Sequence, residues 1–316
     1  MTKYIVQRIL SLIPILLVVA VVVFMLIHLT PGDPASVILG DEASEEAIAQ
    51  LRAQLGLDLP LYQQFISWFG GVITGDLGES IFMDMSVAEA FFSRVPPTLS
   101  LAILAQIFAV IIALSLGVIA ARKRGTLADQ AVMGFSLLGI SVPSFLLGLF
   151  LILFFAVKLQ WLPVAGYQPL SSGLWNHLRY LLLPAIALGA MQAALIARMT
   201  RSSMIEVLSE SYIKTARAKG LKERIVVYKH ALKNAFIPIL TVIGETFGTL
   251  ITGASVIETV FNVPGIGQLI IRSIERRDFA VIQGSILLIT VTYVLLNLLI
   301  DLLYGFLDPR VKLNRR

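Results

Sequence analysis

The sequence is poor in residues that hold metals or form covalent cross-links. It has no cysteine and only three histidines among its 316 residues, and 14% of the residues are charged. The lack of cysteine excludes disulfides and thiolate metal sites. His28, His177 and His230 are dispersed along the chain, with no spacing that suggests a metal site. We therefore expect neither a metal ion nor a resident cofactor.

The sequence also lacks the pattern G-x-x-x-x-G-K-[ST], in which backbone amides cradle nucleotide phosphates. This chain cannot bind a nucleotide by that device. We expect it to have no catalytic residues and no enzymatic activity of its own. If ATP drives its action, the ATPase is a separate polypeptide.

Long apolar runs make up most of the chain. Hydrophobic residues are 57% of the sequence, and the mean hydropathy is +0.85. Six runs approach or exceed the roughly 20 residues that a helix needs to cross a bilayer. They are residues 9–29, 98–121, 131–157, 180–197, 235–257 and 281–307. We predict an all-α membrane protein with six transmembrane helices, the first of which stays in the mature protein as an anchor.

Positive charge is divided unequally between the two sides that six spans define. One side holds both termini, the turn at 122–129 and the segment 198–233, with eighteen of the 25 lysines and arginines. The other side holds seven, and its long loop at 30–95 contains ten carboxylates. Because short cytoplasmic loops are rich in lysine and arginine, both termini are predicted to lie in the cytoplasm, with the chain in the inner membrane. The net charge of +5 then reflects topology and anionic membrane lipid, with no need for a nucleic-acid partner.

The loop between the first two spans is long and expected to be external. Residues 48–55 and 65–69 each place apolar side chains on one helical face. We predict two short amphipathic helices there, which either cap the bundle or contact an external partner. The chain is accordingly divided into an N-terminal helix with its external loop (1–94), a five-helix core (95–307) and a cytoplasmic tail (308–316).

Glu245 and Asp301 are the carboxylates well inside the predicted spans. A carboxylate within a bilayer is a functional candidate, because the cost of placing it there must be offset. Asp301 lies near the end of its span, which favours a structural role. Glu245 lies deeper, and a role in the substrate path or in gating stands beside a structural one. Gly244 and Gly248 form a G-x-x-x-G pair, which favours close helix packing over a direct role in a pore.

The segment 201–234 is charged and helix-patterned, although apolar spans flank it. Its first part is rich in small residues up to Gly220. Beyond the glycine, an apolar stripe recurs at intervals of 4, 3 and 4 residues, formed by Leu221, Ile225, Tyr228 and Leu232. The pattern predicts two short helices that meet at the glycine in a rigid elbow. Such an elbow can carry force between the bundle and a cytosolic partner, or it can lie on the lipid surface.

Within this segment the run K-T-A-R-A-K-G at 214–220 resembles the EAA loop of ABC-importer permeases. Ala216, Gly220 and Leu232 fit the pattern of that loop. Lys214, Thr215, His230 and Lys233 depart from it, but T-A-R-A-K-G-L is similar to the form found in the dipeptide/oligopeptide (peptide/nickel) branch. Further blocks resemble the same branch across nearly the whole chain: H-L-T-P-G-D-P at 28–34, G-D-L-G at 75–78, R-V-P-P-T-L at 94–99, V-P-S-F at 142–145, V-F-N-V-P-G-I-G at 260–267 and L-D-P-R at 307–310.

The resemblance implies a type I ABC importer permease bundle with specific partners. In that family a second, homologous permease subunit forms a heterodimer with the first, two cytosolic ABC ATPase subunits dock on the EAA loops, and an external or periplasmic binding protein delivers the substrate. The implied ATPase-coupling residues are Tyr212, Ala216, Gly220, Leu221 and Leu232. The segment 262–268 resembles a loop near the exit of the binding protein. The candidates for the substrate path or gating are therefore Glu245, Gly248, Asn262, Pro264 and Gly265.

The substrate is less narrowly implied than the family. Similar permeases import dipeptides, oligopeptides, glutathione or nickel complexes, and selectivity rests largely on the binding protein. We predict peptides, with nickel or glutathione as alternatives. Two hypotheses from other classes are an ion-coupled secondary carrier that uses Glu245, and a membrane scaffold whose basic loop binds lipid. ATP dependence of uptake separates the importer from the carrier, and co-purification with an ATPase separates it from the scaffold.

Overall fold

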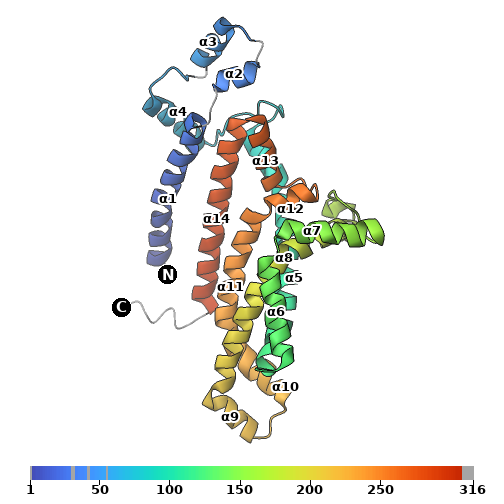
Figure 1. Cartoon of the computed structure of the whole chain (residues 1–316). Helices are drawn as coiled ribbons and strands as arrows, with labels where there is room; N and C mark the ends of the chain where they lie inside the picture. The colour runs from blue at the N-terminus through green and yellow to red at the C-terminus, as the bar shows by residue number, and fades with distance from the viewer. Residues whose placement is uncertain (1, 30–32, 41–42, 55, 308–316) are drawn as a thin grey trace. The chain divides into compact units, whose positions relative to one another are not determined.

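The computed structural model describes residues 2–29, 33–40, 43–54 and 56–307, with side chains for 13–29, 33–40, 43–53 and 56–300. Over these residues the chain is helical, and its β-structure is one isolated bridge between Glu79 and Ser86. The helices are α1 (Thr2–Leu29), α2 (Pro34–Leu39), α3 (Glu45–Gln54), α4 (Leu61–Thr74), α5 (Val87–Arg122), α6 (Leu127–Ser141), α7 (Ser144–Leu151), α8 (Leu174–Ser209), α9 (Ser211–Ala218), α10 (Glu223–Ile225), α11 (Leu232–Gly253), α12 (Ser255–Val260), α13 (Ile266–Arg276) and α14 (Phe279–Leu307) (Figure 1). Shorter turns are the π-helices η1 (Ile152–Lys158) and η3 (Val226–Ala231) and the 3-10 turn η2 (Leu170–Ser172).

The predicted all-α membrane fold is confirmed. In the described part of the chain, four helices are long and apolar enough to cross a membrane: α5, α8, the run 223–253 that ends with α11, and α14 as far as Ile300. A fifth candidate is the pair formed by α6 and the α7–η1 run. α1 is apolar over Ile13–Leu29. The count of six spans stays a prediction, and the side chain of Asp301 and the tail at 308–316 lie outside the described residues.

The predicted span at 131–157 is bent rather than straight. α6 and the α7–η1 run meet at an angle of 101°. Between them Val142 is extended, with φ −84° and ψ 121°, and Pro143 precedes the first residue of α7. The proline ring disfavours helical backbone at the residue before it, so the helix ends there. Pro14, Pro184 and Pro238, by contrast, lie within continuous helices.

The chain forms two compact units, of which the first comprises residues 1–96 and 268–298. In it α3 and α4 occupy the segment where two short helices are expected. α4 contacts α1 through Phe65 and Trp68, whose rings lie 5.3 and 5.7 Å from that of Phe24. α14 is tied to α1 by Gln283, whose Nε2 donates to the carbonyl of Val23 at 3.1 Å. The predicted boundary at residues 94 and 95 stays a prediction.

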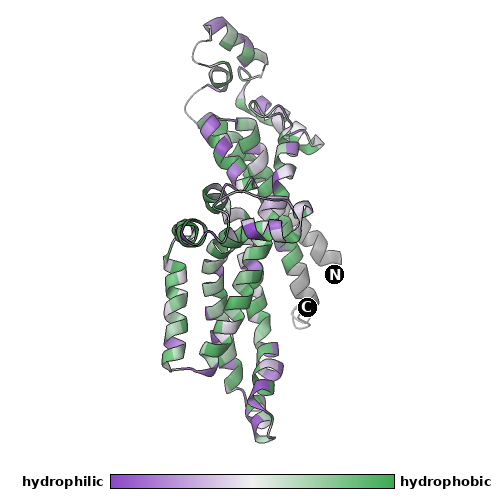
Figure 2. Cartoon of the chain, turned by 90° about the vertical axis from the view of Figure 1, so that its right-hand side faces the viewer, coloured by the Kyte–Doolittle hydropathy of each residue, from purple (hydrophilic) through white to green (hydrophobic). Residues whose placement is uncertain are grey.

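The second unit comprises residues 97–267 and 299–316 and contains the elbow segment. Its central helix is α8, which packs against α6, α7 and α11. Glycines bring α5 close to α8, since a Cβ on Gly117 would lie 2.6 Å from the Cβ of Thr200, and one on Gly189 would lie 2.6 Å from the carbonyl of Ala105. Small residues permit such approach between membrane helices. Figure 2 shows these helices largely hydrophobic, with hydrophilic residues toward the α9 and α10 end.

Candidate functional site: the elbow between α8 and α11 and the hollow beside it

The segment between α8 and α11 folds into two short helical pieces joined at a glycine, and we call residues 210–232 the elbow. α9 ends at Ala218, and Gly220, two residues further on, has a left-handed φ of +74°. The amide of Gly220 donates to the carbonyl of Arg217 at 2.9 Å, and that of Leu221 donates to the carbonyl of Ala216 at 3.4 Å. This is the Schellman pairing, which glycine favours because it has no Cβ to clash. The chain then runs through α10 and η3 into α11.

An ion pair bridges the glycine turn. Arg217 Nη2 and Nε donate to the carboxylate of Glu223 at 2.9 and 3.2 Å. These hydrogen bonds raise the pKa of Arg217, because the carboxylate stabilises the charged guanidinium. The side chains are 43% and 48% exposed, so the pair contributes at most about 1 kcal/mol to stability. Its main consequence is geometric, because it ties the end of α9 to the start of α10.

The inner face of the elbow is part of the apolar core of this unit. Ile213 of α9 is fully buried, and Ala216 is 8% exposed. They join one cluster with residues of η3 and of the long helices α5, α8 and α11, among them Val226, Val227, Ala231, Met204 and Ile239. Close-packed side chains transmit displacement rather than absorb it. The inner face of the elbow is therefore packed continuously with the long helices, and Ala216 belongs to that packing.

The outer face of the elbow carries exposed apolar side chains. Leu221, Ile225 and Tyr228 are 37%, 39% and 51% exposed, and we call these three residues the elbow patch. Exposed lysines lie among them in the sequence, at 222 and 229. An apolar cluster within a charged surface is typical of an interaction site. Leu232, the fourth member of the predicted stripe, is only half-buried at the start of α11.

Tyr212 lies on α9 with 42% of its surface exposed. Its hydroxyl accepts a hydrogen bond from Asn234 Nδ2 at 2.7 Å, and the same amide donates to the carbonyl of His230 at 3.1 Å. The ring of Tyr212 is thus held against the start of α11 while one side remains open. Lys214, where the wider pattern has glutamate, is exposed on the same short helix.

Farther along the same two helices, α8 and α11 line a hollow of about 570 Å³, which we call the polar hollow because six of its nine lining residues carry polar side chains. The residues that line it are Gln192, Leu195, Arg198, Met199 and Ser202 of α8, and Val242, Glu245, Thr246 and Thr249 of α11. Its volume lies within the usual range of small-molecule sites. Gly248 is buried and is not among the lining residues. Over the described residues, no group of three or more histidines and carboxylates is placed to hold a metal ion.

The loop Asn262–Gly267 is built around a carboxylate that sequence analysis missed. Glu258 of α12 is fully buried and accepts a hydrogen bond from Thr98 Oγ1 at 2.5 Å. The hydroxyl of Thr98 accepts in turn from the amide of Ile266 at 2.8 Å. A Cβ on Gly265 would collide with the Glu258 carboxylate, so only glycine lets the loop close over the acid. The signal in the sequence was a lone charge in the apolar run S-V-I-E-T-V, directly after a span.

Of the other candidates in this loop, Asn262 is exposed, with a left-handed φ of +48°, and Pro264 is half-buried. The loop packs on the broken-span region, because the amide of Gly166 donates to the carbonyl of Phe261 at 2.8 Å. A Cβ on Gly148 of α7 would lie 2.9 Å from the Phe261 ring. A role of Asn262, Pro264 and Gly265 in the substrate path stays a prediction.

A second feature that sequence analysis missed is an ion pair between α6 and α8. Arg201 Nε and Nη2 donate to the two carboxylate oxygens of Asp129 at 2.6 and 2.8 Å. The side chain of Asp129 is 5% exposed and that of Arg201 is 26% exposed. The amide of Gly125 also donates to Asp129, at 3.0 Å. The partners lie 72 residues apart in the sequence, where no local periodicity connects them.

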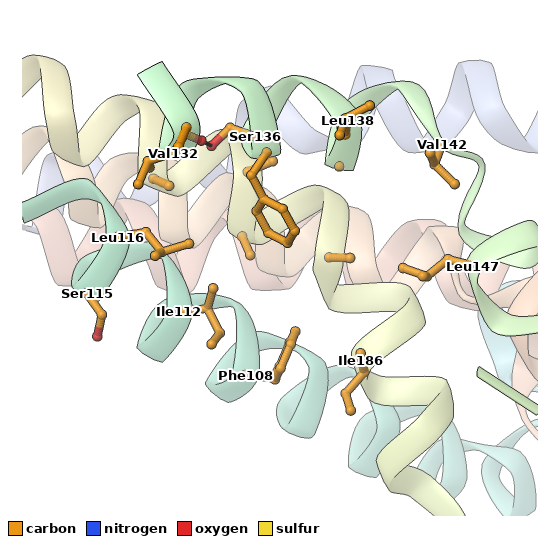
Figure 3. Close-up of a pocket in the computed structure, with 17 residues that line it drawn as sticks. Phe108, Ile112, Ser115, Leu116, Val132, Ser136, Leu138, Val142, Leu147 and Ile186 are labelled. Carbon is orange, nitrogen blue, oxygen red and sulfur yellow. Dashed lines mark hydrogen bonds between the residues drawn. The ribbon is translucent and has the colours of Figure 1, made fainter. Parts of the chain in front are cut away.

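The larger hollow of this unit, about 810 Å³ between α5, α6 and α8, is apolar. Figure 3 shows Phe108, Ile112 and Leu116 along the α5 wall, opposite Val132 and Leu138 of α6. Two serine hydroxyls are the polar side-chain groups among its described lining residues. Burying a peptide group without a hydrogen bond costs roughly 1–3 kcal/mol, so this hollow does not suit a polar substrate. The polar hollow between α8 and α11 is the better candidate for substrate contact.

The sequence matches two family models that together cover most of the chain. Residues 113–313 match the binding-protein-dependent transport system inner membrane component, and residues 1–102 match the N-terminal part of the corresponding membrane components. A probable peptide ABC transporter permease of Sinorhizobium fredii is 45% identical over 312 residues, covering 99% of this chain and 100% of that protein. The glutathione transport system permease of Escherichia coli K12 is also 45% identical over 312 residues, 99% of each chain.

Two solved structures are similar in fold. A chain of the methionine ABC transporter MetNI, in an inward-facing conformation, superposes with a TM-score of 0.58 at 21% identity, covering 70% of this chain and 97% of that one. A chain of an amino acid ABC transporter determined with histidines superposes with a TM-score of 0.51 at 16% identity, covering 71% and 94%. At this level of identity the likeness concerns the fold alone.

Proposed function

The chain belongs to the family of binding-protein-dependent transport system inner membrane components, as an ABC importer permease of the peptide branch, and on that premise we propose that it moves short peptides inward across the inner membrane. The family works with ATPase subunits and a substrate-binding protein. In our proposal two ATPase subunits hydrolyse the ATP, this chain hydrolyses none, and a second, homologous permease completes the bundle. Membership in this family argues against the two other hypotheses, an ion-coupled carrier and a lipid-binding scaffold.

The observation that carries the proposal is the two-faced elbow. Its inner face is continuous with the apolar core, and its outer face presents Leu221, Ile225 and Tyr228 to a partner. We assign the elbow to the cytosol, together with both termini, and the elbow patch to a groove on the ATPase. Closure of the ATPase pair then displaces the elbow, and the displacement reaches α5, α8 and α11 through the shared core.

The coupling residues have different tasks in this proposal. Leu221 and Tyr212 contact the ATPase, Gly220 forms the apex that a partner surface can approach closely, and Ala216 holds α9 against the core from within. Leu232 anchors the start of α11. Full burial of an apolar side chain contributes roughly 1.5–3 kcal/mol. The three patch residues are 37–51% exposed, so covering them contributes a few kcal/mol to the dock as a whole. Lys214 adds positive charge where the wider family has a carboxylate, and it contributes little to this contact.

Peptides are the proposed substrate class because a probable peptide permease is among the similar proteins. Glutathione import is a second candidate, since several similar permeases are named for glutathione transport. Glutathione is itself a tripeptide with free charged ends, so the two candidates share most of their recognition chemistry. Nickel complexes are a third candidate, suggested by the resemblance to the peptide/nickel branch.

A patch variant tests the coupling. Changing Leu221, Ile225 and Tyr228 together to serine is expected to reduce co-purification of the ATPase subunits at least tenfold, because most of the buried apolar area is lost. Leu174→Ser is the matched control, since that leucine is 64% exposed at the start of α8, the end of this 36-residue helix opposite the elbow. Equal ATPase recovery from both variants contradicts the proposed dock.

Uptake measurements test the transport class. Accumulation of radiolabelled trialanine is expected to stop when cytosolic ATP is depleted while the proton gradient is kept. Uptake that survives ATP depletion contradicts an ATP-driven importer. Competition by unlabelled glutathione, measured in the same cells, separates the two substrate candidates.

A further inference from the structure

The polar hollow between α8 and α11 contains one acid and one base on opposite walls. Glu245 projects from α11 and Arg198 from α8, and both line the hollow and are exposed to it. Within the described part of the chain, neither side chain forms an ion pair. A charged group in a membrane-spanning helix costs several kcal/mol unless a partner or water stabilises it. Two opposite charges that share a hollow without pairing are arranged to bind something between them.

A third group in the hollow lacks a partner. Gln192 is 9% exposed, and its Oε1 accepts no hydrogen bond from any described residue, although its Nε2 donates to Thr249 Oγ1 at 3.2 Å. A buried carbonyl oxygen without a donor costs roughly 1–3 kcal/mol. A ligand with an N–H group would remove that cost. The hydroxyls of Ser202 and Thr249 also line this hollow, beside the amide.

The helical register gives the relative position of the three groups. α8 and α11 run in opposite directions on the two sides of the elbow (Figure 1), and the hydrogen bond between Gln192 and Thr249 sets them level with each other. From that bond toward the elbow, Arg198 lies six residues along α8, about 9 Å, and Glu245 lies four residues along α11, about 6 Å. The acid and the base therefore face the same stretch of the hollow, and the amide lies one to two turns deeper.

We infer that this hollow binds the free-ended zwitterion of a short peptide, with its α-ammonium at the Glu245 carboxylate, its α-carboxylate at the Arg198 guanidinium and a peptide N–H at Gln192 Oε1. Guanidinium binds carboxylate through paired hydrogen bonds, which an amide side chain cannot replace. A di- or tripeptide extends about 7–11 Å, which suits a hollow of about 570 Å³. The charges that make a peptide hard to move through lipid are thus met by side chains of the permease itself.

This inference rests on the proposed function, and wild-type uptake is therefore the first arm of its test. The assembled transporter with its binding protein, in proteoliposomes, is supplied with ATP and radiolabelled trialanine. Failure of the wild type to accumulate trialanine contradicts peptide transport itself. Accumulation by the wild type establishes the transport on which the second arm depends.

The second arm measures binding of trialanine, N-acetyl-trialanine and trialanine amide to the permease–ATPase complex in nanodiscs, without the binding protein. Glu245→Gln is expected to weaken trialanine binding about tenfold and to leave the affinity for N-acetyl-trialanine unchanged. Arg198→Gln is expected to weaken trialanine binding about tenfold and to leave the affinity for trialanine amide unchanged. Exposed residues outside the hollow, Glu206 and Arg122, give the control variants Glu206→Gln and Arg122→Gln, which should retain wild-type affinity.

The pattern of losses decides the outcome. The hollow is supported as the site if each variant loses affinity only for peptides with the free end that the changed residue binds, the ammonium for Glu245 and the carboxylate for Arg198. A merely misfolded variant would lose affinity for all three peptides alike. Glu245→Asp, which keeps the charge, should recover part of the affinity. Equal affinity of the wild type for free and blocked peptides, or equal loss of all three probes in Glu245→Gln, overturns the inference while leaving ATP-driven peptide uptake intact.

Discussion

The glycine at the apex of the elbow offers a sharp test of coupling, because a second glycine has the same left-handed backbone and equally open surroundings. Gly220 has φ +74°, and apart from its two chain neighbours no atom of the described residues lies within 4 Å of a Cβ built on it. Gly125, between α5 and α6, has φ +80° and equally open surroundings. Both lie on the side predicted to be cytoplasmic. Replacing either by alanine therefore imposes the same kind of backbone penalty on this chain.

That penalty is roughly 1–2 kcal/mol for an L-residue in the left-handed region. Gly220→Ala and Gly125→Ala should thus lower the free energy of unfolding by similar amounts. They should differ in ATPase binding, because only at Gly220 does the proposed partner surface approach the added methyl. A methyl forced into a packed contact costs typically 1–3 kcal/mol, which weakens association by about fivefold to a hundredfold.

Gly220→Asn separates the backbone from the contact. Asparagine adopts the left-handed conformation more readily than alanine, so stability should largely return while ATPase binding stays weak. The assay is binding of the purified ATPase subunit to each variant in detergent, with thermal unfolding of the same samples. The reasoning is refuted if Gly220→Ala binds the ATPase as well as Gly125→Ala does, or if asparagine restores binding together with stability.

Three further variants test the packing within the second unit, each by thermal unfolding in detergent. Arg201→Gln should lower the free energy of unfolding by about 3 kcal/mol, because it leaves the buried Asp129 carboxylate without its partner. Replacing both Arg201 and Asp129 by leucine should recover part of the loss. An unchanged Tm in Arg201→Gln contradicts this. Gly265→Ala should lower the free energy of unfolding by roughly 1–3 kcal/mol, because the added methyl collides with the Glu258 carboxylate. The loss caused by Gly265→Ala should be smaller in a chain that also carries Glu258→Ala. Strictly additive effects of the two changes argue against the contact. Gly117→Ala places a methyl 2.6 Å from a buried threonine side chain of α8 and should also cost roughly 1–3 kcal/mol, whereas a neutral result denies the close approach of α5 to α8.

Several features of the elbow were predictable because they are local. A left-handed glycine after a helical run, and apolar residues at intervals of 4 and 3, are properties of neighbouring residues in the sequence. Leu221, Ile225 and Tyr228 are accordingly all exposed. Leu232 packs instead against the apolar core. The π-helical turn η3 lies just before it, and because the hydrogen bonds of a π-helix span five residues instead of four, the turn changes the phase of the side chains that follow. The sequence contained no sign of that turn.

Long-range pairs were not predictable in the same way. Glu245 attracted attention because it interrupts a long apolar run, yet the fully buried acid of this unit is Glu258, held by Thr98 across 160 residues of sequence. In the sequence Asp129 is one carboxylate beside a basic turn, and nothing there connects it with Arg201, its partner in the structure. Hydrogen bonds of this kind depend on how helices pack, and packing brings together residues whose separation in the chain carries no periodic signal.

The sequence by itself determined the membrane, the helices, the family and the elbow. An uncharged run of about 20 residues must satisfy its backbone hydrogen bonds internally once it is in lipid, which leaves the helix as its only form, and a glycine-punctuated amphipathic stretch carries its own geometry. Only the tertiary structure decided which face of the elbow is open, that the third apolar run bends by 101°, and that Glu245 shares a hollow with Arg198 and Gln192. Those outcomes depend on which helices become neighbours, and that choice is made by close packing across the whole unit.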